Sequence, residues 1–395
     1  MLPSYYEFHN PVKIVSGNKA LDNLPSELEL LGVSRPMVIT DRGVSDAGLV
    51  KLFTSCFNSS GMTIGAIFDD VPPDSSSAVV ARITGIFRRN QCDSLVALGG
   101  GSVIDTAKGV NILVSEDADD LLAFSGADRL KKPLKPLVVI PTTSGTGSEV
   151  TVVAVVTDLD RNLKMPFASK YLLPDIAILD PRLTLTLPPM ITAATAMDAM
   201  CHAVESFICL QKNPLSDAYA VAAIELIRKN VIRAVGEDHG KEEIRLAMAN
   251  ASTMAGIAFS NSMVGIVHAL GHAAGAVCHM PHGTAMNIFL PPGLEYNMKK
   301  SRDNIARLLL PMAGADIYSR TPESRRAEEM IHQLRALRSA IHDICGLPMT
   351  LKQAGVTKDK LTEIAHVAVD DPSTVMNPRD MDVKDALNIL ERAYQ

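Results

Sequence analysis

Short apolar runs rich in β-branched residues recur in the first half of the sequence, and segments with helical periodicity separate them. Three of the runs cover residues 37–41, 95–98 and 137–140, and apolar residues keep a helical spacing over 75–89 and 103–114. Strands that alternate with helices in this way predict a mostly parallel sheet with helices on both faces. In such sheets, ligands bind at the loops that follow the carboxyl ends of the strands.

The pattern changes near residue 183. Beyond it, apolar residues keep a helical spacing almost without interruption, and β-branched runs become rare. We therefore predict two domains, which suits a chain of 395 residues. Residues 1–183 are expected to form an α/β domain, and residues 184–395 an all-helical domain. Glycine-rich segments lie in the first part and a cluster of histidines in the second, and this division predicts a ligand in a cleft between the domains.

Composition and charge argue against several classes of function. The formal net charge is −6 and no stretch rich in Lys and Arg occurs, which argues against a nucleic-acid partner. No apolar run approaches the ~20 residues of a membrane-spanning helix, and the first residues lack the basic and apolar regions of a signal peptide. The six cysteines show no Cys-x-x-Cys spacing and are expected to be reduced thiols. We therefore expect a cytoplasmic protein with no membrane partner.

Two loops that follow predicted strands carry the residues expected of a nucleotide site. The first is Gly99-Gly100-Gly101-Ser102, where glycine lets backbone N–H groups approach a phosphate at the start of a helix. The standard fingerprints G-x-G-x-x-G and G-x-x-x-x-G-K-[ST] are absent there, so a plain tight turn explains this loop equally well. The second loop, 141–148, is rich in Gly, Thr and Ser. Two such loops at neighbouring strand ends favour a bound dinucleotide.

Three charged residues near these loops each have two interpretations. Asp41 stands at the end of a predicted strand, where a carboxylate accepts hydrogen bonds from an adenosine ribose and repels a 2′-phosphate, which favours NAD over NADP. Alternatively, it is an Asp that begins a turn. Asp105 and Lys108 lie on the helix after the glycines, where they would reach the nicotinamide end and the diphosphate respectively, or form a solvated surface pair.

Histidines cluster in the helical part of the sequence and predict a metal site. His268 and His272 are four residues apart and therefore share one helix face, and Asp198 and His202 repeat this spacing. His282 stands between Pro and Gly, in a predicted turn that would direct it toward the helix. Either pair alone is more often a hydrogen-bonded core feature. Together they favour a divalent first-row metal, which a carboxylate and imidazoles suit.

Four motifs occur together and in order along the chain. They are Gly99-Gly100-Gly101-Ser102-x-x-Asp105-x-x-Lys108, Pro141-Thr142-Thr143-x-Gly145-Thr146-x-Ser148-Glu149, Asp198-x-x-x-His202-x-x-Glu205, and His268-x-x-x-His272 followed by Pro281-His282-Gly283. In this combination the sequence resembles the iron-dependent (group III) alcohol dehydrogenases over essentially its whole length. The resemblance implies an α/β N-terminal dinucleotide-binding domain and an all-α C-terminal domain. It also implies a metal-dependent, NAD(P)-linked alcohol dehydrogenase or aldehyde reductase that acts on a small primary alcohol or aldehyde.

The resemblance further implies roles for individual residues. The metal ligands are Asp198, His202, His268 and His282, with Fe²⁺ as the metal and Zn²⁺ or another divalent ion as the alternative. His272 handles the proton beside the metal. NAD, preferred to NADP, is held by Asp41, Gly99, Gly100, Gly101, Ser102, Asp105, Thr142, Thr143, Thr146, Lys164 and Leu183. The substrate pocket includes Phe259, Val264 and Val153, and at the last position diol-oxidising members tend to carry Asn.

The main alternative is a metal- and NAD-dependent lyase similar to dehydroquinate synthase, which shares the two-domain plan. It would need Lys or Arg near the metal to bind a phosphorylated polyhydroxy acid, and residues 246–290 contain neither. A sensor that binds metal or nucleotide without catalysis is a third interpretation, and nothing resembling an effector domain supports it. A homodimer or larger homo-oligomer is expected.

Overall fold

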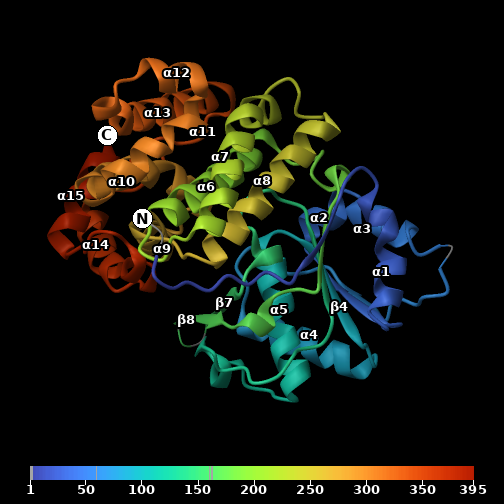
Figure 1. The fold of residues 1–395 in the computed structure, drawn as a ribbon. Helices are drawn as coiled ribbons and strands as arrows, with labels where there is room; N and C mark the ends of the chain where they lie inside the picture. Colours follow the sequence, from blue (N-terminus) through green and yellow to red (C-terminus); the bar gives the residue numbers. More distant parts are fainter. Residues whose placement is uncertain (1–2, 59, 160, 162) are drawn as a thin grey trace. The chain divides into compact units, whose positions relative to one another are not determined.

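The computed structural model describes residues 3–395 except 59, 160 and 162, and it separates into two compact units (Figure 1). The α/β unit comprises residues 10–187, and the helical unit comprises residues 188–395 together with the N-terminal segment that ends at His9. The chain passes between the units twice, after His9 and after Leu187, whereas the sequence pattern predicted a single boundary after residue 183. Each unit has its own hydrophobic core.

A six-stranded parallel sheet forms the centre of the α/β unit. Its strands are, in spatial order, β1 (Lys13–Ser16), β9 (Ile176–Leu179), β6 (Leu137–Pro141), β4 (Ser94–Gly99), β2 (Pro36–Ile39) and β3 (Ala66–Phe68). Neighbouring strands run parallel, and Gly99 on β4 lies in register with Pro141 on β6. The two glycine-containing loops therefore leave adjacent strands at the same edge of the sheet, as their order in the sequence predicted.

Helices cover both faces of this sheet (Figure 1). They are η1 (Ala20–Asn23), α1 (Leu24–Leu30), α2 (Arg42–Asp46), α3 (Leu49–Ser55), α4 (Ser77–Arg89) and α5 (Gly101–Glu116). Along β2, Met37 and Ile39 pack in a core with residues of α4 and α5, whereas Val38 packs in a core with residues of α1 and α3. This alternation follows the two-residue period of a strand. The predicted parallel sheet with two covered faces is confirmed.

A second, three-stranded sheet packs against α5, and the sequence analysis did not predict it. It contains β5 (Gly126–Ala127), β8 (Leu163–Ala168) and β7 (Val153–Asp158), of which β7 and β8 are antiparallel. In β7, Ala154 and Val156 are buried while Val155 is exposed. Such alternation marks a strand with one solvated face, unlike the fully buried runs that reveal the parallel strands. The 3-10 helices η2 (Leu121–Phe124), η3 (Ser148–Val150), η4 (Lys170–Leu172) and η5 (Pro181–Leu183) complete the unit.

The helical unit is built from helices throughout. They are α6 (Pro189–Ile208), α7 (Pro214–Val235), α8 (Glu242–Ser260), α9 (Ile266–Cys278), α10 (His282–Arg307), α11 (Leu309–Ala313), α12 (Ala315–Arg320), η6 (Glu323–Arg325), α13 (Arg326–Cys345), η7 (Lys358–Lys360), α14 (Leu361–Val369), η8 (Pro372–Met376) and α15 (Val383–Tyr394). Helices α6, α7 and α8 lie side by side (Figure 1). Across the described residues, no helix combines the length and apolar character needed to cross a membrane.

Two predicted elements differ from the structure. The predicted turn around His282 is the start of α10, with Pro281 as the N-cap and His282 as the first helical residue. Proline just before a helix is tolerated because the first N–H groups of a helix lack an intrahelical acceptor. Residues 44–57 keep a helical spacing that predicts a single helix, but the chain breaks at Gly48, whose φ of 78° is left-handed, so α2 and α3 are separate.

Candidate metal centre and nucleotide-binding loops

The four predicted metal ligands converge from three helices of the helical unit. Asp198 and His202 are one turn apart on α6, His268 is on α9, and His282 begins α10. Oδ1 of Asp198 lies 3.2 Å from Nε2 of His282, 3.8 Å from Nε2 of His202 and 4.0 Å from Nε2 of His268. The ligand atoms of Asp198, His268 and His282 all lie within 4.8 Å of one another. One carboxylate oxygen is thus faced by three imidazole nitrogens.

The spacing and the unpaired atoms of this cluster fit a divalent cation. Four donors placed tetrahedrally at about 2.1 Å from a metal lie roughly 3.4 Å apart, close to the separations measured from Asp198. Asp198 Oδ1 and His268 Nε2 are buried and have no hydrogen-bond partner among the described residues. Buried polar atoms are seldom left unpaired in proteins, so each unpaired atom calls for an explanation. A cation bound by both atoms supplies that explanation.

Burial disfavours the protonated form of the two buried imidazoles, His202 and His268. Burial lowers the pKa of His202 to about 3 and lowers the pKa of His268 well below its usual value. At Asp198 burial alone would raise the pKa, but the facing imidazoles of His202 and His282 outweigh it and hold the pKa below its usual range. An ionised carboxylate with neutral imidazoles is the protonation state that metal binding requires.

Glu205, also on α6, contacts the far side of the His268 ring. Its Oε2 lies 2.5 Å from Nδ1 of His268, and its Oε1 accepts a hydrogen bond of 2.8 Å from the backbone N–H of Val267. The residue is 1% exposed, and burial raises the pKa of Glu205 to about 7 although backbone N–H groups work in the opposite direction. Glu205 stands in a motif quoted above, but its partner lies 63 residues away, so no local sequence signal indicated its role.

His272, one turn after His268 on α9, pairs with Asp371, a residue that sequence reasoning missed. Nδ1 of His272 lies 2.9 Å from Oδ2 of Asp371, and Oδ1 of Asp371 accepts a hydrogen bond from the N–H of Ser373. Burial would raise the pKa of Asp371, but the hydrogen bond and charge of His272 lower it to about 2. The rings of His272 and His282 stack with centroids 5.5 Å apart. His272 therefore lies beside the cluster of candidate metal ligands.

Two of the predicted pocket residues belong to the same unit as this cluster. Phe259, near the end of α8, stacks on the ring of His202 with a centroid distance of 4.2 Å. Val264 is half-buried in the connection between α8 and α9. Val153, the third, is the first residue of β7 in the α/β unit. Phe259 gives the cluster of candidate ligands an aromatic neighbour.

In the α/β unit, the two predicted nucleotide loops contact each other. The N–H of Thr142 donates a hydrogen bond of 3.1 Å to the carbonyl oxygen of Gly99. A Cβ at Gly101 would lie only 2.9 Å from Cγ2 of Thr146, so a side chain there would fill the space between the loops. Gly101 also begins α5, whose N-terminus attracts anions. The other predicted loop residues are Gly100, Ser102 and Thr143.

The remaining predicted cofactor residues, Asp41, Lys164 and Leu183, lie outside the two glycine-containing loops. Asp41 follows β2 and is the N-cap of α2, where its Oδ1 accepts a hydrogen bond of 2.9 Å from the N–H of Val44. This is the turn-starting role given above as the second interpretation, and it uses one carboxylate oxygen. Lys164 is exposed on β8. Leu183, at the end of η5, is 1% exposed and packs in a hydrophobic core of the unit.

Both interpretations of Lys108 were wrong. Lys108 is fully buried, and its ammonium group donates hydrogen bonds to the carbonyl oxygens of Thr151 (2.8 Å) and Val153 (2.9 Å), so it neither reaches a diphosphate nor lies at the surface. Oδ2 of Asp105 accepts a hydrogen bond from the N–H of Val155, while its Oδ1 is buried with no hydrogen-bond partner among the described residues. Burial lowers the pKa of Lys108 to about 8 and raises that of Asp105 to about 6.

Replacing Lys108 by Met should destabilise the α/β unit by about 3 kcal/mol, because it leaves two carbonyl groups and the Asp105 carboxylate without their buried cation. Calorimetric unfolding of the whole protein measures this change. Lys51→Met, at an exposed position on α3, is the matched control and should change stability by less than about 0.5 kcal/mol. Equal unfolding temperatures for the two variants would contradict a structural role for Lys108.

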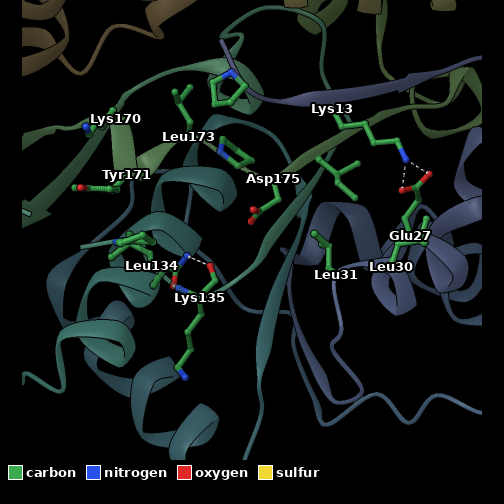
Figure 2. Close-up of a pocket in the computed structure, with 15 residues that line it drawn as sticks. Lys13, Glu27, Leu30, Leu31, Leu134, Lys135, Lys170, Tyr171, Leu173 and Asp175 are labelled. Carbon is green, nitrogen blue, oxygen red and sulfur yellow. Dashed lines mark hydrogen bonds and ion pairs between the residues drawn. The ribbon is translucent and has the colours of Figure 1, made fainter. Parts of the chain in front are cut away.

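A cavity of about 340 Å³ opens at the opposite edge of the parallel sheet (Figure 2). Its lining includes Asp175 and Lys135, which stand just before β9 and β6, and the ion pair of Lys13 and Glu27. Ligands of parallel sheets bind at the carboxyl ends of the strands, whereas this cavity lies at the amino ends. It is therefore separate from the two glycine-containing loops.

Comparison with known proteins gives one consistent family. Residues 11–181 match the family model of the iron-containing alcohol dehydrogenases, and residues 192–394 match the model of the C-terminal part of that family. The NAD-dependent methanol dehydrogenase of Bacillus methanolicus is 33% identical over 388 residues, which cover 98% of this chain and 99% of that protein. A crystal structure of 1,3-propanediol oxidoreductase matches with a TM-score of 0.94 and 33% identity, covering 99% of this chain and 100% of that one. Sulfoacetaldehyde reductase from Bifidobacterium kashiwanohense, solved with NAD⁺, matches with a TM-score of 0.85 and 26% identity over 99% of both chains.

Proposed function

Because the chain belongs to the iron-containing alcohol dehydrogenase family and is an NAD(P)-dependent oxidoreductase acting on alcohols, we propose that it interconverts a small primary alcohol and its aldehyde, using NAD and a divalent metal. The proposed metal ligands are Asp198, His202, His268 and His282. The observation that carries the proposal is the convergence of three imidazole Nε2 atoms on one buried carboxylate oxygen. Fe²⁺ is the proposed metal, and Zn²⁺ suits the same donors.

When bound, the cation supplies Lewis acidity toward the substrate oxygen, and NAD supplies the acceptor for hydride. Among the chain's own residues, His272 is proposed to transfer the proton of the alcohol. Its Nδ1 faces the Asp371 carboxylate, which accepts hydrogen bonds only, so the exchangeable proton position is Nε2. The Phe259 ring stacks on His202 and places an apolar surface beside the cluster, which favours an apolar substrate chain.

The experiment that tests this function is a panel of aldehydes assayed for NADH consumption by the purified protein with added Fe²⁺. The panel includes short aliphatic aldehydes, lactaldehyde, and aldehydes that bear a sulfonate or a phosphonate. Chelation of the metal should lower turnover by more than about a hundredfold, and Fe²⁺ or Zn²⁺ should restore it. Turnover that persists in metal-free protein would overturn the metal-dependent mechanism. Failure of every aldehyde and alcohol with metal-loaded protein would overturn the proposed function.

Carboxylates at the ends of two neighbouring strands favour NAD over NADP. Asp41 follows β2, and Asp69 and Asp70 follow β3, which pairs with β2. Arg42, the cation next to Asp41 in sequence, is already paired with Asp70 through a contact of 3.1 Å. A 2′-phosphate placed near Asp41 would therefore meet net negative charge.

Replacing Asp41 by Ser should raise the ratio of kcat/KM for NADP to kcat/KM for NAD by at least about tenfold, because repulsion of the 2′-phosphate is removed. Serine keeps the N-cap of α2, so the change in preference is separated from a change in stability. Asp46→Ser, at an exposed position at the end of α2, removes the same charge and should leave the ratio within about threefold. Equal shifts for the two variants would indicate a general charge effect.

We also propose that the protein forms a homo-oligomer. Strand β1 is an edge strand of the parallel sheet, and Ile14 at its centre is 38% exposed. An exposed edge strand is a template for pairing with a second chain. Light scattering on the purified protein measures the assembly, and a monomer at micromolar concentration would contradict this proposal.

A further inference from the structure

We propose that Glu205 is a positioning residue that fixes the ring orientation and the tautomer of His268 at the proposed metal centre. The inference deepens the proposed function and rests on it, since it takes His268 to bind the metal through Nε2. Glu205 is not itself in the ligand set around Asp198. Its carboxylate contacts Nδ1 of His268, whereas Nε2 is the nitrogen that faces Asp198.

Glu205 joins two of the helices that carry the proposed ligands. It lies on α6, three residues after His202, and its two oxygens contact Nδ1 of His268 (2.5 Å) and the N–H of Val267 (2.8 Å) at the first turn of α9. A Cβ at Gly265, the N-cap of α9, would lie 3.0 Å from Oε1 of Glu205. The absence of a side chain at residue 265 therefore allows the carboxylate to approach the helix end this closely.

The chemistry of the contact selects one tautomer. In its ionised form the Glu205 carboxylate can only accept hydrogen bonds, and Nδ1 of His268, which it contacts at 2.5 Å, then carries the proton. In a neutral imidazole the other nitrogen then has a free lone pair, and that nitrogen is Nε2, which is buried with no hydrogen-bond partner among the described residues. A carboxylate behind a ligating histidine also increases the basicity of the ligand nitrogen. Glu205 thus prepares Nε2 as a metal ligand.

The beginning of α9 has a second anchor that does not involve His268. Asn377 accepts a hydrogen bond of 3.3 Å from the N–H of Ile266, and it is held in turn by two hydrogen bonds with Asn297. Because two residues satisfy N–H groups at this helix end, loss of one contact leaves an anchor in place. The effect of Glu205 on His268 can therefore be separated from its effect on the helix.

The first test observes the tautomer directly in the unaltered protein. Nitrogen NMR of the metal-free, full-length protein with labelled histidine reports which ring nitrogen of each histidine carries the proton. The His268 signal is identified by its absence from His268→Ala. We expect the proton on Nδ1. A proton on Nε2 in the unaltered protein would overturn the proposal, and this measurement does not depend on the folding of a Glu205 variant.

The second test replaces Glu205 by Gln. The amide oxygen can still accept from Val267, but the NH₂ group then faces Nδ1 and requires a lone pair there, so the proton moves to Nε2, where the metal would bind. Zn²⁺ affinity, measured by competition with a chromophoric chelator, should weaken about 10–100-fold. Glu205→Asp, which keeps the carboxylate but shortens its reach, should recover part of the affinity.

The matched control is Cys201→Ala. Its sulfur is fully buried and lies 3.9 Å from both the Glu205 carboxylate and Nδ1 of His268, so the variant disturbs the same place without changing the acceptor. Its Zn²⁺ affinity should stay within about threefold of the unaltered protein. If Glu205→Gln binds Zn²⁺ as tightly as this control, the proposal is wrong. If His268→Ala also leaves the affinity unchanged, the proposed metal centre itself is wrong.

Discussion

Replacement of His268 or His282 by Ala is expected to remove the metal and the activity together. Each substitution takes away one of the three imidazoles that face Asp198. A Lewis-acidic cation supplies several kcal/mol of charge stabilisation in the transition state. At 1.36 kcal/mol per tenfold change in rate, loss of about 5 kcal/mol lowers kcat/KM by roughly 10³–10⁴. Metal content is measured by atomic emission, and kcat/KM with NADH and the best aldehyde of the panel.

The same two variants should differ in stability, which separates the metal effect from a folding effect. His268 is 3% exposed and partners a buried Glu205 carboxylate, so His268→Ala leaves a cavity and an unpaired buried group, at a cost of about 2–4 kcal/mol. The His282 side chain is 39% exposed at the first residue of α10, and its replacement should cost less than about 1 kcal/mol. Thermal unfolding of the two metal-free variants and of the unaltered metal-free protein measures these differences in stability.

His279→Asn is the control for both variants. His279 is exposed at the C-cap of α9 with a left-handed φ of 55°, a conformation that Asn tolerates. Its metal content and kcat/KM should stay within about twofold of the unaltered protein. A His268 or His282 variant that lost its metal but kept normal turnover would show that this cluster is not the catalytic centre.

The fold class could be predicted because its signals are local. The buried runs that became β2, β4 and β6 are fixed by their own residue types, and the order of strands and helices limits the connections between them. The register of Gly99 with Pro141 then brings the two loops together. Local residue types are misleading at α10. Pro291 and Pro292 lie in its interior, where proline usually breaks a helix. Burial of this helix in the core stabilises it nevertheless.

The partners of the site residues could not be predicted, because each contact joins distant parts of the chain. Glu205 and His268 are 63 residues apart, and His272 and Asp371 are 99 apart. Helical spacing showed which histidines share a face, but not which carboxylate meets the opposite nitrogen of each ring. Lys108 shows the same limit. Its residue type suggested a position at the surface or beside a phosphate. In the structure it is buried and donates hydrogen bonds to carbonyl groups more than forty residues away.

A methyl group added at Gly283 should disrupt the proposed metal centre without touching any proposed ligand. The Cβ of Gly283→Ala would lie 2.4 Å from the carbonyl oxygen of Ala194 and 2.7 Å from its carbonyl carbon, and both are backbone atoms of α6. Helices α6 and α10 must therefore separate by about 0.6 Å or more. Ala194 is one helical turn before Asp198, and Gly283 directly follows His282, so this movement pulls two proposed ligands apart.

The expected result for Gly283→Ala is a loss of about 3 kcal/mol of stability and a Zn²⁺ affinity at least about tenfold weaker, because functional sites tolerate displacements of only about 0.5 Å. Gly275→Ala on α9 is the control, and it is expected to stabilise the protein rather than destabilise it. Its Cβ would meet the carbonyl oxygen of Met280 at an ordinary 3.5 Å, and alanine in a helix interior is about 0.5–1 kcal/mol more stable than glycine. If both variants bound Zn²⁺ like the unaltered protein, the close contact of α6 with α10 would not be what holds Asp198 and His282 together.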